Sequence, residues 1–254
     1  MMERVAVLSD VHAVAPALEA VLNEPDVVAA DRVVFTGDLL PGPLPRRTLD
    51  LVAELGDRAV WLRGNGERDT LRLRGPEPPQ AKTPLIQWCA DQVTEADLAV
   101  LAALPPVVTL EVTGLGAVLF CHATPRDDEE LVLVDSDDDR WREVLAGVAP
   151  AESVVVCGHT HMPFLRLVDG RVVLNPGSVG MPFGPSGAHW ALLGPGVQLR
   201  RTLVDAHAAQ GAVERGSDFP GIGAWIEPYL TGGISDAGAK RRMRSRQDDR
   251  ARGC

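Results

Sequence analysis

Side chains that can bind metal ions recur along the 254-residue sequence, each time just after a short apolar run. Asp10 and His12 are two residues apart, and so are His159 and His161. Side chains two residues apart in an extended segment point to the same side, so each pair can direct two ligands toward one point. Three more candidates follow apolar runs in the same way: Asp38, Asn65 and His122. Together these residues predict a metal centre.

The donor types indicate which ions the centre would hold. Imidazole combined with carboxylate suits Mn, Fe, Zn or Ni, whereas an all-oxygen set would suit Mg or Ca. Two divalent ions bring four positive charges, against three negative charges from Asp10, Asp38 and a bridging hydroxide. The net positive charge would attract a phosphate and stabilise charge on its oxygens. We therefore expect two divalent metal ions and a small phosphorylated substrate.

The candidate ligands need strands that bring them together. Apolar, β-branched runs of four to six residues are typical of buried strands. The expected strands are Arg4–Leu8, Arg32–Phe35, Ala59–Leu62, Val107–Val112, Ala117–Cys121, Ser153–Cys157, Arg171–Leu174 and His189–Leu193. The expected helices are Ala15–Asn23, Arg47–Leu55, Thr94–Leu104, which Thr94 would cap, and Asp137–Leu145. All candidate ligands then lie at the carboxyl ends of strands, where ligands bind in open α/β sheets.

Element order predicts the fold class. The first part of the chain alternates strand and helix, which implies a parallel sheet covered by helices. The later strands are joined by short turns such as Val168–Gly170, which implies a second, more antiparallel sheet. We expect an α/β fold of two sheets flanked by helices, with a proline-rich rim loop at Gly75–Pro84.

Composition limits the setting and the partners. The net charge of -10 argues against a general nucleic-acid or membrane binder, because an acidic surface repels phosphate backbones and anionic lipids. The four cysteines form no CxxC pair, which favours a reduced, cytoplasmic setting. No apolar stretch approaches the length of a membrane span. Nothing in the sequence indicates the oligomeric state.

The last residues differ in character from the rest. Between Lys240 and Cys254 there are seven Lys or Arg and two Asp. We expect a main domain over residues 1–235 and a basic, disordered tail over residues 236–254. A nucleic-acid-binding arm is the alternative interpretation of this tail, and the one route by which we expect nucleic acid as a partner.

At the level of motifs, the sequence resembles the calcineurin-like metallophosphoesterases, and within them the small prokaryotic branch. The motifs are Asp10-Val11-His12, Gly37-Asp38-Leu39-Leu40, Gly64-Asn65-Gly66-Glu67, His122 and Gly158-His159-Thr160-His161. Three further segments fit that branch: Gly42-Pro43, Cys121 to Pro125 and Asn175 to Gly180. The resemblance covers about residues 5 to 193.

The resemblance implies a four-layer αββα sandwich of two mixed sheets, and it assigns roles to the ligands. Asp10, His12 and His161 would hold one metal ion, and Asn65, His122 and His159 the second. Asp38 would bridge the ions, and a metal-bridging hydroxide would attack phosphorus. Asp38, Asn65 and His122 would then be the catalytic residues.

The surroundings of Asn65 carry further expectations. Many family members have a histidine after this asparagine, which is thought to assist the leaving group, but this chain has Gly66. We expect slower turnover of esters with poor leaving groups, or a substitute residue or water. Asn65, Arg68 and Arg126 are candidate substrate contacts, since guanidinium matches phosphate geometry. Glu67 is expected to support the site from behind the ligands.

The expected activity is hydrolysis of phosphate mono- or diesters. Two alternatives stay open: a Ser/Thr protein phosphatase with the same chemistry, and a non-catalytic metal-binding scaffold of the same fold. A scaffold that has lost its metals should lack several ligands, and here all seven are present. A substrate, a native metal and a preference for monoesters or diesters are not specified by these residues.

Overall fold

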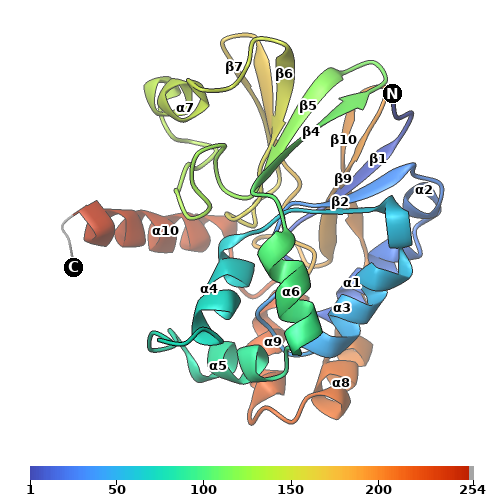
Figure 1. Cartoon of the computed structure of the whole chain (residues 1–254), viewed down its shortest axis with the longest axis vertical. Coiled ribbons are helices and arrows are strands. Elements are labelled where there is room, and N and C mark those ends of the chain that lie inside the picture. Colours follow the sequence, from blue (N-terminus) through green and yellow to red (C-terminus); the bar gives the residue numbers. More distant parts are fainter. Residues whose placement is uncertain (252–254) are drawn as a thin grey trace.

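Two five-stranded sheets form the centre of the molecule (Figure 1). The computed structural model describes the backbone of residues 1–251 and the side chains of residues 1–245. The first sheet has the strand order β10-β9-β1-β2-β3, and the second has the order β4-β5-β6-β8-β7. The mixture of parallel and antiparallel pairs in each sheet confirms the predicted fold class.

The first sheet is built on three parallel strands. β1 pairs with β2 and β2 with β3 in parallel, while β9 and β10 run antiparallel on the other side of β1. The helices between β1, β2 and β3 confirm the predicted alternation of strand and helix. The strands are β1 Val5–Leu8, β2 Arg32–Phe35, β3 Ala59–Trp61, β9 Ala188–Leu193 and β10 Val197–Thr202.

The second sheet has a parallel centre and an antiparallel strand at each edge. β5, β6 and β8 are parallel neighbours, whereas β4 and β7 pair antiparallel with β5 and β8. Asp169 and Gly170 have positive φ in the predicted turn between β7 and β8. The strands are β4 Val107–Val112, β5 Gly116–Cys121, β6 Glu152–Val156, β7 Phe164–Val168 and β8 Arg171–Asn175.

A buried apolar layer joins the two sheets. Val7 and Val34 from the first sheet and Phe120 and Val156 from the second belong to one cluster, and all four are fully buried. Removing such a side chain from water stabilises the fold by about 1.5–3 kcal/mol. This layer fixes the sheets against each other, and so fixes the distance between the loops at their carboxyl ends.

Helices cover both outer faces, which completes the predicted four layers. Leu18 of α1 and Ile226 of α9 pack with Phe35 and Trp190 on the first sheet, and Trp141 of α7 packs on the second. The helices are α1 Ala15–Leu22, α2 Pro25–Val28, α3 Pro45–Glu54, α4 Asn65–Leu73, α5 Pro84–Asp91, α6 Glu95–Ala103, α7 Asp138–Leu145, α8 Ala206–Gly216, α9 Ile222–Leu230 and α10 Asp236–Ala251, with a 3-10 turn η1 at Gly56–Arg58. Within residues 1–251, none of these helices has the length and apolar character needed to cross a bilayer.

Two edge strands, β7 and β10, were not predicted from the sequence. Edge strands are partly exposed, and Arg166, Gln198 and Arg200 interrupt their apolar runs. The predicted cap of α6 is confirmed, because the Thr94 hydroxyl accepts a hydrogen bond from the Asp97 amide.

The C-terminal tail, predicted to be disordered over residues 236–254, differs most from expectation. Its first sixteen residues form α10, and residues 252–254 lie outside the described residues. Ala239 and Met243 are buried one helical turn apart, so two apolar residues are enough to seat a helix that composition alone marks as solvated. The division into a domain over residues 1–235 and a separate tail stays a prediction.

Candidate metal centre

All seven predicted ligand residues meet at one end of the two-sheet sandwich. Asp10 and His12 follow β1, Asp38 follows β2, and Asn65 begins α4 after β3. His122 follows β5, and the His159–His161 pair follows β6. Because β1 and β2 are parallel neighbours in one sheet and β5 and β6 in the other, these strands end at the same place.

The first group of ligands is Asp10, His12 and His161. Their ligand atoms all lie within 4.8 Å of one another. The Nε2 atoms of His12 and His161 are 3.2 Å apart, and His161 Nε2 is 3.2 Å from Asp10 Oδ1. Asp10 and His12, which follow β1, thus face a third donor, His161, which follows β6 of the other sheet.

The second group is Asp38, His122 and His159, whose ligand atoms also lie within 4.8 Å of one another. Asp38 stands between the two groups. Its Oδ1 is 3.4 Å from His122 Nε2, and its Oδ2 is 3.8 Å from His12 Nε2. One oxygen of this carboxylate therefore faces each group.

Asn65 adds a fourth donor to the second group. One terminal atom of its amide lies 3.0 Å from His122 Nε2 and 2.9 Å from His159 Nδ1. When this atom is the oxygen, its lone pair and those of the two ring nitrogens point to one place. A cation at that place would satisfy all three. When the amide turns over, its NH₂ group donates to both rings instead. A bound cation would favour the first orientation, with the oxygen toward the two rings.

The polar atoms of the site fit a pair of divalent ions. Asp10 Oδ1 is fully buried and has no hydrogen-bond partner among the described residues. Burial raises the pKa of Asp38 from 3.8 to about 7, so this carboxyl group gains from a neighbouring cation. Burial also lowers the pKa values of His12 and His159 to about 3, which keeps both imidazoles neutral and their lone pairs available.

Hydrogen bonds to backbone carbonyls set which nitrogen of each histidine points inward. His12 Nδ1 lies 3.2 Å from the Pro41 carbonyl, and His161 Nδ1 lies 2.8 Å from the Met181 carbonyl. His122 Nδ1 lies 2.8 Å from the Thr36 carbonyl. When a neutral ring donates from Nδ1, its Nε2 lone pair points the other way, so these carbonyls orient three rings with Nε2 toward the site.

The backbone at the ligands is held in a conformation that side chains rarely adopt. Asp10, His12, Asp38, His159 and His161 have φ between 47° and 65°. Such left-handed non-glycine residues cost about 1–3 kcal/mol each and cluster at functional sites. The surrounding structure must offset that cost.

Glu67 is one group that offsets it. This fully buried carboxylate accepts hydrogen bonds from the backbone amides of Asp38 (2.9 Å), Leu40 (3.1 Å) and Gly64 (2.9 Å). It therefore ties the loop after β2 to the start of α4. The sequence suggested a supporting role for Glu67, and the structure supplies its partners.

The Asn175–Gly180 segment contacts the loops that follow β1 and β6. The Ser178 hydroxyl donates to the Asp10 carbonyl at 2.6 Å, and Asn175 Nδ2 donates to the Gly158 carbonyl at 2.6 Å. This segment thus links the loop after β1 to the loop that carries His159. These contacts could not be predicted from the sequence, because the partners of the segment are distant in the chain.

Gly66 occupies the position where many family members carry histidine. A Cβ atom at Gly66 would lie 2.0 Å from the Leu40 carbonyl oxygen, so no side chain fits without a backbone shift. The Gly66 amide donates to Asp38 Oδ1 at 2.6 Å. The loop that carries Leu40 therefore occupies the space that a histidine side chain at this position would need.

We expect Gly66→Ala to lose about 1–3 kcal/mol of stability, the usual cost of overpacking, and to bind metal more weakly because the forced backbone shift would move the amide of this residue away from Asp38 Oδ1. Thermal unfolding and metal content of the purified variant measure both effects. Gly147→Ala is a suitable control, since apart from its chain neighbours no atom lies within 4 Å of its added Cβ. Equal melting and metal content in Gly66→Ala and the wild type would contradict the expectation.

The two arginines proposed as substrate contacts are already paired with carboxylates. Arg68 contacts Asp128, Asp69 (3.1 Å) and Glu129 (2.9 Å). Arg126 contacts Glu130 (2.6 Å) and, on α7, Glu143 (2.7 Å). Either arginine would have to leave these partners to reach a phosphate, and their role in substrate binding stays a prediction.

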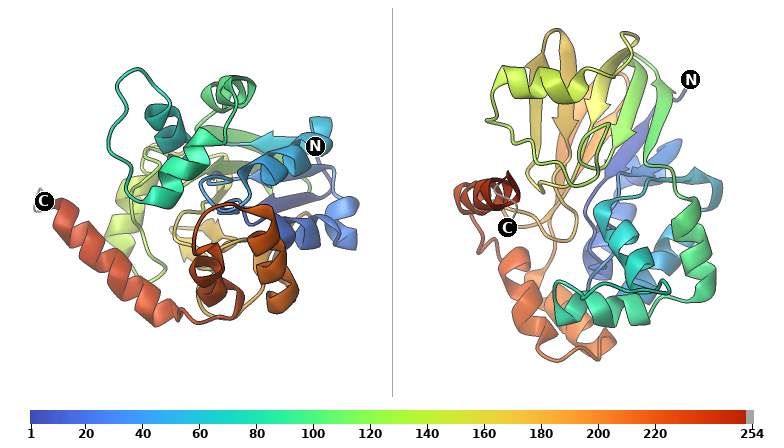
Figure 2. Two further views of the ribbon diagram at one scale, coloured as in Figure 1. Left: turned by 90° about the horizontal axis from the view of Figure 1, so that it is seen from below. Right: turned by 60° about the vertical axis from the view of Figure 1, so that its left-hand side comes forward.

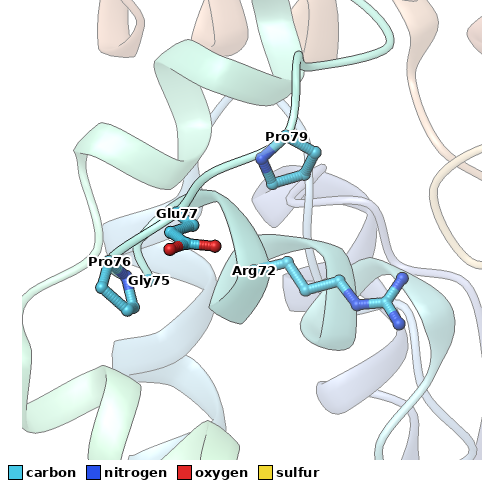
Figure 3. Close-up of a pocket in the computed structure, with 5 residues that line it drawn as sticks. All are labelled: Arg72, Gly75, Pro76, Glu77 and Pro79. Atoms are coloured by element: carbon cyan, nitrogen blue, oxygen red, sulfur yellow. The ribbon is translucent and has the colours of Figure 1, made fainter.

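The loop predicted at Gly75–Pro84 is present up to Thr83, and Pro84 begins α5. With Arg72 of α4, its residues Gly75, Pro76, Glu77 and Pro79 line a pocket of about 490 Å³ (Figure 3). None of the seven ligand residues lines this pocket. The loop meets the neighbourhood of the metal centre instead through Lys82, which pairs with Asp69 and Glu129.

Comparison with known proteins agrees with this geometry. A family model described as the calcineurin-like phosphoesterase superfamily domain matches residues 2–194. An uncharacterised protein of Methanocaldococcus jannaschii is 26% identical over 202 residues, covering 70% of this chain and 76% of the relative.

Two solved structures have a similar fold. A hypothetical protein from Pyrococcus horikoshii OT3 has a TM-score of 0.75 at 16% identity, covering 91% of this chain and 99% of the other. A metallophosphoesterase from Sphaerobacter thermophilus has a TM-score of 0.70 at 24% identity, covering 91% of this chain and 100% of the other. At these identities the two likenesses concern the fold.

Proposed function

This chain belongs to the calcineurin-like phosphoesterase superfamily, and on that premise we propose that it hydrolyses phosphate mono- or diesters with two divalent metal ions. The observation that carries the proposal is the position of Asp38, whose two oxygens face two separate groups of buried ligands. Mn, Fe, Zn or Ni would suit this set of imidazole, carboxylate and amide donors.

The proposed roles divide the seven ligands into two sets of three, each holding one ion, and one bridging residue. Asp10, His12 and His161 would hold one ion, and Asn65, His122 and His159 the other, with Asp38 shared. When bound, two such ions supply hydroxide at neutral pH and clamp the oxygens of an in-line displacement. The chain itself supplies imidazoles whose orientation is fixed by backbone carbonyls, and a buried setting that strengthens the charge interactions.

The leaving group receives little help from the chain at the usual position. Gly66 has no side chain to donate a proton, and the Leu40 carbonyl fills the space beside it. We therefore propose that esters with good leaving groups, such as aryl phosphates, are turned over faster than alkyl esters, which need a proton from a general acid or water.

A metal and substrate panel tests the proposed function. Purified full-length chain should lose hydrolysis of an aryl phosphate after chelation and regain it when Mn²⁺, Ni²⁺ or Zn²⁺ is added. Metal content is measured on the same sample. Turnover is compared among aryl monoesters, aryl diesters and a phosphoserine peptide. Two ions per chain with no turnover of any ester would favour the scaffold alternative, and preference for the peptide would favour a protein phosphatase. Hydrolysis that survives complete removal of metal would contradict the proposal.

A further inference from the structure

The C-terminal helix α10 packs beside the first group of ligands. Ala239 and Met243 are buried in the part of α10 whose side chains are described, and Met243 lies in a small apolar cluster with Leu133 and Met162. The half-buried ring of Phe183 packs against the same cluster. Figures 1 and 2 show α10 lying along the outside of the molecule, close to the loops that follow the second sheet. Met243 of α10 therefore packs with Met162, the residue after His161, and with the loop that carries Phe183.

Polar contacts hold α10 in the same place. Lys240 and Arg244, one turn apart on the helix, both pair with Asp135, at 3.3 and 2.8 Å. Just before the helix, the Ile234 carbonyl accepts a hydrogen bond of 2.9 Å from the Gly184 amide. The segment before α10 is thus attached to Gly184, which follows Phe183, and α10 itself is attached to the loop that carries Leu133.

Phe183 connects this attachment to a ligand. Its ring stacks on the imidazole of His161, with centroids 5.2 Å apart and planes tilted by 15°. Two residues earlier, the Met181 carbonyl faces His161 Nδ1 at 2.8 Å. The 181–184 loop therefore fixes His161 by its face and by its outer nitrogen, and the cluster that contains Met243 of α10 packs against Phe183 of that loop.

We propose that α10 is a positioning element of the metal centre, which holds Phe183 against His161 through Met243 and so sets the ion affinity of the Asp10–His12–His161 group. The inference rests on the proposed two-metal function. α10 lies beyond residues 2–194, which the family model matches, so the ligands belong to the family domain while this support comes from outside it. Groups that orient a metal ligand typically change ion affinity by 10–100-fold when they are lost.

The test isolates the first group within the full chain. His122→Ala removes a ligand of the second group, so that Mn²⁺ binding, followed by loss of the free-ion EPR signal, reports on the first. In this background, Met243→Ala and Phe183→Ala should each weaken Mn²⁺ binding about tenfold. Met243→Leu, which keeps an apolar side chain of similar volume, should restore it. Arg241→Ala is the matched control, because Arg241 is exposed on the same helix.

Asp135→Asn gives a second variant that loosens α10 without altering the apolar cluster, and it should weaken Mn²⁺ binding in the same direction. Thermal melting shows that each variant is folded. Unchanged Mn²⁺ affinity in folded Met243→Ala, Phe183→Ala and Asp135→Asn would overturn the positioning role while leaving the proposed function intact. A wild-type chain that binds no divalent metal would instead overturn the proposed function itself.

Discussion

Asp38→Ala should lower the turnover of an aryl phosphate by about 10³-fold, which corresponds to about 4 kcal/mol of transition-state stabilisation. The reason is that the Asp38 carboxylate faces both ligand groups, with His122 at 3.4 Å and His12 at 3.8 Å. Its removal leaves two incomplete groups and takes away the negative charge that separates two divalent ions.

Two measurements separate this loss from a general loss of structure. Metal content by mass spectrometry should fall from two ions to one or fewer, while far-UV circular dichroism stays unchanged. Asp57→Ala is the matched control, because Asp57 lies exposed in η1, between α3 and β3. Full metal content and full activity in Asp38→Ala would remove the central element of the proposal.

Glu67→Gln should produce the largest loss of stability. The carboxylate accepts three backbone hydrogen bonds, whereas a glutamine side chain has only one oxygen and turns an NH₂ group toward at least one of the three amides. A buried hydrogen bond to a charged group contributes about 1.5–3 kcal/mol, so we expect a loss of about 2–4 kcal/mol. For a chain of this size the melting temperature should fall by about 5–15 °C.

The change at Glu67 should also reach the metal centre, because its partners are the amides of Asp38, Leu40 and Gly64. We expect weaker metal binding in the folded variant and partial recovery of activity at high Mn²⁺ concentration. Glu54→Gln, on the exposed surface of α3, is the control. A Glu67→Gln protein that melts with the wild type would mean that the three amides find other acceptors.

The ligand set could be predicted from the sequence because its chemistry is local. Each ligand stands within a few residues of the end of an apolar run, and parallel strands must end at a shared edge. The supports could not be predicted in the same way. Ser178 lies 168 residues from the Asp10 carbonyl that it contacts, and Phe183 stacks on His161 from a different loop. Only the tertiary fold brings such pairs together.

The fold shows the same division. Buried strands of one apolar run were recognised, whereas arginines interrupt the apolar runs of the edge strands β7 and β10. The tail was interpreted from its average charge, yet Ala239 and Met243 seat α10, and they are the apolar side chains buried between residues 236 and 245. Average composition cannot report a single well-placed contact. The cytoplasmic setting, the partners and the native metals stay predictions.

Each ligand group takes residues from both sheets: Asp10 and His12 with His161 in one, and Asp38 and Asn65 with His122 and His159 in the other. A bound ion therefore acts as a crosslink between the two halves of the sandwich. By mass action, each site filled at 100 times its dissociation constant would add about 2.7 kcal/mol to the free energy of unfolding. The supply of metal in the cell would then govern how long this protein persists as well as how fast it works.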